Sequence, residues 1–415
     1  MNTKKFLILL IVLSTVWTGM GMPAAGQSSG PHPLLEKGEP VEWWFVFKFN
    51  AATFPGCGDD GERSCLFGGT VQDYKSQFSQ QFVYASSKNP HIQKGTGCLG
   101  STLKDPVGAT FDQVYNGSYY YVIWNDQFYD DPRIHGCSGG CDAPWGHAKG
   151  MVAWNDDGEG FVMQVTTPSW PASGNSAFPR KDGNTLGCVA DNDIEFSQHF
   201  FALRLNKDDL IKILLAVQNA SVVTDPANKQ IVSNGGPPDA QALVKQLGQK
   251  SSSTTRTTAK LSSGVELISK PSSLSTPPWQ MVSGTLNSVP LRTATWWAHP
   301  EIPTTTETTA VDCWGEDLGT PGPVQIATTG VWDGTAFSLK GGAQPDSNHA
   351  KIGVSTDPSR PYAIFGDLNQ QGALSGNCKS SQNGRGGTFY ILNNRVLFDS
   401  LTDLIKGETA DVVSK

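Results

Sequence analysis

The feature that most constrains this chain is a tripeptide that occurs twice, once in each half. His147-Ala148-Lys149 and His349-Ala350-Lys351 share their spacing and their central alanine, and an apolar run follows each of them. Residues i and i+2 of a β-strand point to the same face of a sheet, so each tripeptide on a strand would set an imidazole beside an ammonium. If two such strands meet across a pseudo-twofold axis, both pairs converge on one point. The spacing therefore predicts a duplicated architecture with one shared site.

Two imidazoles and two ammoniums at one point suit a phosphodiester. Lys149 and Lys351 would neutralise the phosphoryl oxygens, while one of His147 and His349 attacks phosphorus and the other protonates the leaving oxygen. The near symmetry of the two motifs leaves open which histidine takes which role. A single His-x-Lys is more often a half-exposed surface strand, but two copies in a matching frame favour a site.

The first 26 residues have the pattern of a signal peptide. Lys4 and Lys5 precede an apolar run over residues 6–16, and Ala24-Ala25-Gly26 forms a small-residue cleavage site. No later stretch is apolar enough to cross a bilayer. We therefore expect a soluble exported protein with no membrane anchor, secreted or periplasmic, or lysosomal if the source is eukaryotic.

All eight cysteines follow the predicted signal peptide. An even number in an exported protein indicates disulfides. Six lie in the first half and two in the second, which predicts the pair Cys313–Cys378. Cys137 and Cys141, followed by His147, have an alternative interpretation as metal ligands, although the oxidising compartment favours disulfides and no second pair has zinc spacing.

The formal net charge of −7 and the pI of about 5.5 argue against a protein that holds nucleic acid on a general basic surface. An enzyme whose positive charge is confined to a cleft remains compatible with this balance. The acidic composition also fits a protein that works at low pH, where carboxylates and histidines take up protons.

Composition divides the chain into segments. Residues 222–276 are predicted to form a polar Ser/Thr-rich loop or linker, because they include the low-complexity run 251–258. This leaves an N-terminal half, residues 27–221, and a C-terminal half, residues 277–415. Helical spacing of apolar residues predicts a helix over residues 197–218, which the polar residues 206–209 can divide in two. A terminal helix is predicted over residues 389–405. Strands are predicted at residues 41–49, 119–124, 148–154, 160–166 and 362–365.

Further short motifs extend along most of the chain. They are Gly146–Gly150, Gly160-Phe161, Phe178-Pro179, Gly187-Cys188-Val189 and Gln198–Phe201, then Asn348–Lys351, Gly366-Asp367-Leu368-Asn369 and Arg385-Gly386-Gly387. In content and order they resemble the deoxyribonuclease II family of the phospholipase D superfamily. The resemblance implies an α/β fold, with mixed sheets and packed helices, in which two phospholipase D-like halves form a pseudo-twofold dimer within the single chain.

The same resemblance implies an acid endonuclease that needs no metal and no cofactor. It would hydrolyse DNA through a phosphohistidine to leave 3′-phosphate ends, with DNA as its partner and no obligate protein partner. His147 and His349 would be catalytic, and superfamily analogy favours His147 as the nucleophile. The substrate phosphate would be bound by Lys149, Lys351, Asp367 and Asn369.

Several positions keep alternative interpretations. Asn155 stands where an acidic residue is commoner in the family, so a carboxylate partner for His147 from that turn is in doubt. Asp367 and Asn369 also suit a simple turn. The loop at Arg385 either contacts phosphate or is floppy, and His199 is expected to be structural.

Two other function classes remain. One is a different phospholipase D-type phosphodiesterase acting on RNA or phospholipid, although no amphipathic anchor follows the signal. The other is a non-enzymatic, disulfide-rich secreted binding protein in which the His-x-Lys strands are incidental. DNA cleavage in the presence of a chelator would discriminate among them.

Overall fold

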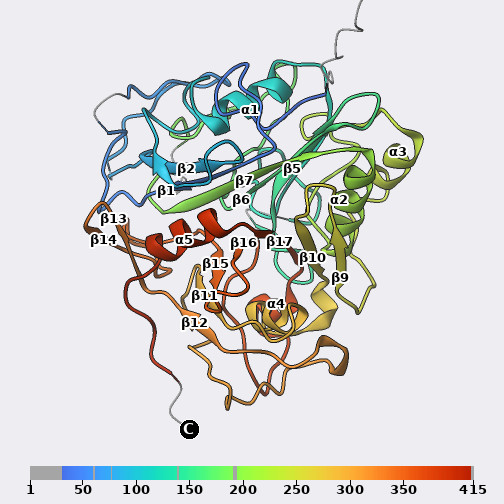
Figure 1. Cartoon of the computed structure of the whole chain (residues 1–415). Helices are drawn as coiled ribbons and strands as arrows, with labels where there is room; N and C mark the ends of the chain where they lie inside the picture. Colours follow the sequence, from blue (N-terminus) through green and yellow to red (C-terminus); the bar gives the residue numbers. More distant parts are fainter. Residues whose placement is uncertain (1–29, 59–60, 76, 138–139, 190–193, 413–415) are drawn as a thin grey trace, which may run out of the picture.

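The computed structural model describes residues 30–58, 61–75, 77–137, 140–189 and 194–412. The signal peptide predicted over residues 1–26 lies outside these ranges. Within them, no helix has the length and apolar character needed to cross a membrane. Figure 1 shows one sheet with α1 in the upper part of the view and a second sheet with α4 in the lower part.

The first sheet has the strand order β3-β2-β1-β7-β6-β5-β4-β8, and its neighbouring strands are antiparallel. Its strands are β1 (Trp43–Lys48), β2 (Phe82–Ser86), β3 (Gln93–Lys94), β4 (Tyr120–Asn125), β5 (Lys149–Trp154), β6 (Gly160–Val165), β7 (Gln198–Leu205) and β8 (Val232–Ser233). Strands β1, β5 and β6 are buried along their whole length, so this sheet is covered on both faces.

The second sheet has the order β12-β11-β15-β16-β17-β10-β9, with β11 and β12 parallel and the other pairs antiparallel. Its strands are β9 (Thr257–Lys260), β10 (Glu266–Lys270), β11 (Leu291–Ala294), β12 (Val324–Ile326), β15 (Ile352–Ser355), β16 (Tyr362–Gly366) and β17 (Gly387–Asn393). A separate hairpin pairs β13 (Thr329–Trp332) with β14 (Thr335–Ser338).

Helices cover the sheets, which confirms the α/β class with mixed sheets and packed helices. They are α1 (Pro106–Tyr115), α2 (Lys207–Asn219), α3 (Pro238–Val244), α4 (Pro278–Thr285) and α5 (Arg395–Leu404), with short 3-10 turns at Ser272–Leu274, Glu316–Leu318 and Ser381–Gly384. The side chains of Asn206 and Asn394 cap the first turns of α2 and α5, because each accepts a main-chain N–H there.

The two predicted long helices are wrong in their first parts. Residues 197–218 form β7 and then α2, and residues 389–405 form most of β17 and then α5. Both strands are buried on both faces, so their nearly continuous apolar sequence lacks the alternation that marks a half-exposed strand. One asparagine, Asn206 or Asn394, separates the strand from the helix each time. This N-cap residue marks the start of the helix, and the hydrophobic spacing alone did not indicate it.

The strands that follow the two tripeptides occupy matching positions. β5 lies in the run β1-β7-β6-β5-β4, and β15 lies in the run β10-β17-β16-β15-β11. Residues 222–276 contribute β8 to the first sheet and β9 and β10 to the second, so this segment is more than a loop; Leu267 and Ile268 of β10 are buried. The matching order favours a duplication, while the pseudo-twofold axis and the boundaries of the halves stay predictions.

The two sheets pack against each other through aromatic side chains. Phe365 of β16 stacks on Phe45 of β1 with ring centroids 4.7 Å apart, and on Phe201 of β7 at 4.6 Å. All three rings are fully buried. This shared core holds the two motif strands in a fixed relative position, which loosely linked domains would not do.

Candidate active site

The two tripeptides lie at one cavity. Each histidine is anchored by the other part of the chain, because the main-chain N–H of His147 donates to the carbonyl of Gly386 (2.8 Å) and that of His349 donates to Ser197 (2.7 Å). The cavity has a volume of about 230 Å³. It is lined by His147, Lys149, His349, Lys351, Gln127, Thr166, Trp296 and Asn369. The structure thus brings together both predicted histidines, both predicted lysines and Asn369.

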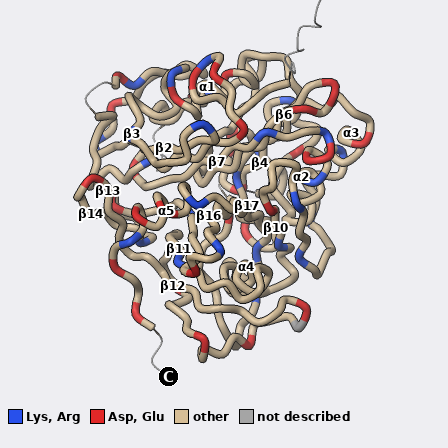
Figure 2. The backbone as a smooth tube through the Cα atoms, viewed as in Figure 1, with Lys and Arg blue, Asp and Glu red and all other residues tan. Residues whose placement is uncertain are grey.

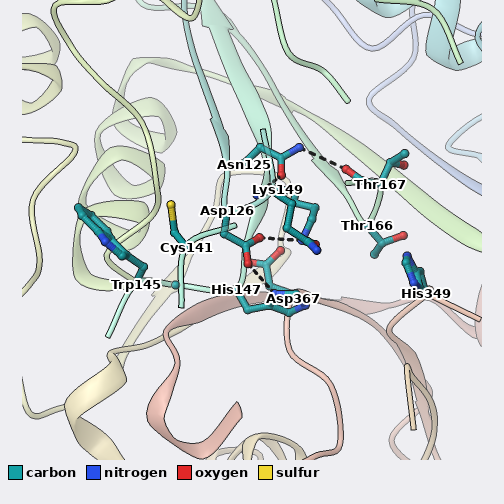
Figure 3. A network of polar contacts seen from close by, with 12 residues as sticks. Asn125, Asp126, Cys141, Trp145, His147, Lys149, Thr166, Thr167, His349 and Asp367 are labelled. Carbon is teal, nitrogen blue, oxygen red and sulfur yellow. Dashed lines mark hydrogen bonds and ion pairs between the residues drawn. The ribbon is translucent and has the colours of Figure 1, made fainter. Parts of the chain in front are cut away.

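His147 has a carboxylate partner in Asp126. Its Nδ1 lies 2.8 Å from Asp126 Oδ2, and Lys149 Nζ lies 2.7 Å from Oδ1 of the same group. Figure 3 shows Asp126 in contact with both side chains, and His349 on the opposite side of the site beside Thr166. Asp126 directly follows β4, whose last residue Asn125 pairs with Lys149 at the start of β5. Antiparallel pairing therefore delivers this carboxylate to the tripeptide.

The buried charges around Asp126 shift the titration of this cluster. Burial alone would raise the pKa of Asp126, but His147, Lys149 and Arg385 outweigh it and hold that pKa well below its usual range. Burial lowers the pKa of His147 to about 3; Asp126 opposes this shift and the charge of Lys149 adds to it. In the free protein, the imidazole of His147 is accordingly neutral at mildly acid pH.

Arg385 is not among the residues that line the cavity, and its loop is held by hydrogen bonds rather than floppy. Contact of this loop with phosphate stays a prediction. Arg385 Nη2 lies 2.7 Å from Asp126 Oδ2, and its guanidinium donates to main-chain carbonyls of the segment that precedes His147. The side chain is only 10% exposed. Its hydrogen-bonding capacity is directed at protein groups rather than at a substrate.

His349 has an aromatic environment instead of a carboxylate. Its ring contacts Phe196 and Trp296, with centroid separations of 4.7 Å and 4.3 Å. Gln198 Nε2 lies 3.4 Å from His349 Nδ1. Burial, and then the charge of Lys351, hold the pKa of His349 well below its usual range.

Both lysines are almost fully buried at the cavity wall. Lys149 is paired with Asp126, whereas Lys351 Nζ donates to the carbonyl of His349 at 2.6 Å. Burial, and then the charge of Lys149, hold the pKa of Lys351 well below its usual range. An anion entering the cavity would relieve the repulsion between these ammoniums.

Asp367 and Asn369 are placed differently from each other. Asp367 does not line the cavity; it accepts hydrogen bonds from Thr388 and Gln164, and burial raises its pKa to about 6. Asn369 does line the cavity and donates from Nδ2 to Gln371. Its buried Oδ1 has no hydrogen-bond partner among the described residues. Phosphate binding by either residue stays a prediction.

Two further residues have structural surroundings. His199 is fully buried, and its Nδ1 accepts the main-chain N–H of Lys351 at 3.0 Å. Asn155 builds the turn after β5, because its Oδ1 accepts from the main-chain N–H groups of Asp157 and Glu159. The carboxylate partner of His147 is Asp126, which does not belong to this turn.

The cysteines form four disulfides, and the predicted pair Cys313–Cys378 is confirmed. The others are Cys57–Cys98, Cys65–Cys188 and Cys137–Cys141. Because Cys137 and Cys141 bond to each other, their alternative interpretation as metal ligands is wrong. Over the described ranges, no group of three or more His, Cys, Asp or Glu side chains could hold a metal ion.

Paired imidazoles and ammoniums on a two-sheet α/β scaffold are the groups that a phosphodiester-cleaving enzyme needs. Comparison with known families agrees with this class. The profile of deoxyribonuclease II matches residues 33–409, nearly the whole chain. The chain belongs to the deoxyribonuclease II family and is a deoxyribonuclease, a hydrolase of phosphodiester bonds. Among curated proteins, the search found no matching sequence.

Sequence reasoning assigned no site role to Asp126, to Gln198 or to the lining residues Gln127, Thr166 and Trp296. Asp126 had a usable signal, since it directly follows the strand that a hairpin-like sheet would set beside the first tripeptide. Gln198 lies in a motif of the family resemblance, but its role, like that of Trp296, depends on an approach to His349 from a distant part of the chain.

Proposed function

We propose that the chain is an acid endonuclease that cleaves DNA through a phosphohistidine on His147, leaving a 3′-phosphate and a 5′-hydroxyl without a metal ion. The observation that carries this proposal is the convergence of two histidines, in unlike hydrogen-bonding environments, with two lysines on one small cavity. The finer assignments follow from those environments.

The nucleophile is His147. Asp126 accepts a hydrogen bond from the Nδ1–H of His147, so the ring proton stays on Nδ1 and the lone pair of Nε2 is free to attack phosphorus. The new N–P bond forms as the bond from phosphorus to the 5′-oxygen breaks, which leaves the phosphoryl group on the 3′ side. The carboxylate also stabilises the positive charge that the imidazole acquires. Lys149 and Lys351 stabilise the charge on the phosphoryl oxygens.

The general acid is His349. The amide of Gln198 faces Nδ1, and its orientation is set by the hydroxyl of Thr166, which donates to Gln198 Oε1 at 2.8 Å. The acid is the imidazolium form of His349, whose Nε2 proton passes to the departing 5′-oxygen and leaves a neutral ring. In the second step His349 takes a proton from water, whose oxygen attacks phosphorus and releases His147.

Acid conditions favour both binding and chemistry. The pKa of His349 is depressed in the free protein, so a protonated donor requires low pH and the negative charge of bound phosphate. Lys and Arg are interspersed with Asp and Glu over both parts of the chain (Figure 2). With a net charge of −7 the protein repels DNA at neutral pH, and protonation of carboxylates weakens that repulsion.

Export of the protein forms part of the proposal. Four disulfides and the predicted signal peptide support a secreted, periplasmic or lysosomal location. The test is to express the full chain in a host that exports it and to determine the N-terminus of the recovered protein, which is expected near Gln27. Recovery of the uncleaved chain inside the cell would contradict this part.

The test of the chemistry compares two substrates at about pH 5 in the presence of EDTA. One is plasmid DNA, and the other is thymidine 3′-(4-nitrophenyl phosphate), whose leaving group needs no protonation. His147→Ala should lose activity on both. His349→Ala should lose about 10² to 10⁴-fold on DNA. Its first-turnover burst of nitrophenolate from the nitrophenyl ester should fall much less, because His349 is then needed only as the base of the second step. The exposed His91 provides the control variant His91→Ala, which should keep both rates.

Protein quenched in alkaline denaturant, which preserves a P–N bond, should carry the 3′-phosphoryl end of DNA on His147, and the final DNA products should end in 3′-phosphate. If the substrate pattern of the two variants is reversed, the histidine roles are reversed. If both variants fold and cleave DNA at the wild-type rate, the site is elsewhere.

A further inference from the structure

Arg385 belongs to the C-terminal part of the chain but is bonded to the N-terminal part. It follows the 3-10 turn Ser381–Gly384 and precedes β17. Its Nη2 contacts Asp126 Oδ2 and the carbonyls of Cys141 and Gly146, and its Nε donates to the carbonyl of Trp145 at 2.7 Å. These acceptors surround the segment that leads into His147.

One carboxylate oxygen is shared between Arg385 and the proposed nucleophile. Asp126 Oδ2 accepts from His147 Nδ1 at 2.8 Å and from Arg385 Nη2 at 2.7 Å, while Oδ1 accepts from Lys149. A carboxylate held on both oxygens has one orientation, so the direction of the Nδ1 hydrogen bond is determined. That direction in turn sets where His147 Nε2 points.

The loop that carries Arg385 is itself fixed from both sides. Lys270 Nζ, fully buried, donates to the carbonyl of Arg385 at 2.9 Å. The next residue, Gly386, accepts the main-chain N–H of His147. A Cβ at Gly386 would lie 2.1 Å from the carbonyl oxygen of Ala220, so the close approach requires glycine. Side chain and main chain of this loop therefore act on the same histidine.

We propose that Arg385 is a positioning residue for His147: acting through Asp126, it aims the imidazole at phosphorus and makes attack depend on the docking of the C-terminal part. The inference rests on the proposed role of His147 as nucleophile. The charged groups facing this histidine are Asp126, Lys149 and Arg385 on its own side, and Lys351 and His349 across the cavity. Asp142, 3.9 Å from Arg385, is fully exposed.

The test uses Arg385→Gln and Arg385→Lys in the full chain. The matched control is Arg360→Gln, because Arg360 also combines a carboxylate (Asp357, 2.7 Å) with main-chain carbonyls but lies away from the cavity. Arg385→Gln should lower kcat on DNA about 10²-fold, with KM changed only a few-fold, since a misplaced nucleophile affects the chemical step. Arg360→Gln should leave kcat unchanged.

The pH profile distinguishes positioning from simple loss of folded protein. Removing the positive charge of Arg385 favours the imidazolium of His147, so Arg385→Gln should move the acid limb of kcat/KM to higher pH. NMR titration of the His147 ring in the free protein should shift the same way. Arg385→Lys keeps the charge without the planar fork, so the limb should stay in place while kcat falls about tenfold.

The inference would be overturned if Arg385→Gln had the wild-type kcat and an unmoved acid limb of its pH profile. It would also be overturned if the loss of kcat were fully explained by a smaller fraction of folded protein. If Arg385→Gln does not fold, the Lys variant decides: wild-type kcat there would also overturn it. His147→Ala, measured alongside, separates the two proposals. An active His147→Ala protein refutes the proposed function, whereas an inactive one beside normal Arg385 variants refutes the positioning role alone.

Discussion

The main-chain N–H of His147 donates to the carbonyl oxygen of Gly386, a residue from the other end of the chain, at 2.8 Å. The N–H of His349 makes the corresponding bond to Ser197 at 2.7 Å. Each tripeptide is thus held by a segment that is far from it in the sequence. The two histidines can face one cavity only when both sheets are docked.

Asp126→Asn should reduce kcat on DNA by about 10² to 10⁴-fold. The amide would present an N–H to His147 Nδ1 and place the ring proton on Nε2, where it blocks attack. Buried Lys149 and Arg385 would also lose their counter-charge, at a cost of about 3–5 kcal/mol in the free energy of unfolding. Kinetics and urea denaturation measure both effects. Asp239→Asn, which removes an exposed partner of Lys207, is the control and should behave as wild type.

Chelators should leave DNA cleavage unchanged. Mg²⁺ is usually held in proteins through one or two carboxylates, and the residues that line this cavity include two lysines but no carboxylate. The rate of plasmid DNA cleavage is measured at acid pH with and without EDTA after exhaustive dialysis. If EDTA abolishes cleavage and added Mg²⁺ or Zn²⁺ restores it, the chemistry depends on a metal.

The profile of kcat/KM against pH should be bell-shaped, with its maximum on the acid side of neutrality. Below about pH 3 the neutral, attacking form of His147 is lost, because its pKa is about 3 in the free protein. Towards neutral pH the protonated form of His349 becomes rare, because its pKa lies well below the usual range. The two limbs of the profile report apparent pKa values of the coupled pair of histidines and not of either residue alone. A rate that climbs steadily to about pH 9 would be incompatible with a two-histidine mechanism.

Asp367 should make the folded protein less stable as pH rises from about 4 through about 6. Its pKa is raised to about 6, so in this window the folded state binds a proton that the unfolded state has released. The contribution amounts to about 3 kcal/mol at most. It is measured as the difference in unfolding free energy between wild type and Asp367→Asn across this window. A difference that is flat with pH would show that Asp367 is already ionised at acid pH.

Local sequence patterns predicted a large part of the site. The i, i+2 spacing of His147 with Lys149, and of His349 with Lys351, indicated a shared site. The predicted placement of both tripeptides on strands is wrong, because β5 begins only at Lys149 and β15 only at Ile352. Counting cysteines on either side of the chain's middle was enough to predict Cys313–Cys378, which the structure confirms. The order of short motifs indicated the family to which the chain belongs.

Tertiary structure decided what differs between the two histidines. Asp126 reaches His147 through strand pairing, Arg385 reaches Asp126 across the interface of the sheets, and Gln198 and Trp296 reach His349 from separate segments. These contacts depend on which strands become neighbours, and that is settled by burying continuous apolar strands such as β7 against one another. Such strands carry no alternation from which their neighbours, or even their secondary structure, can be inferred. Sequence therefore indicated the histidines and lysines that line the cavity, whereas long-range packing decided their hydrogen-bond partners, their burial and their orientation.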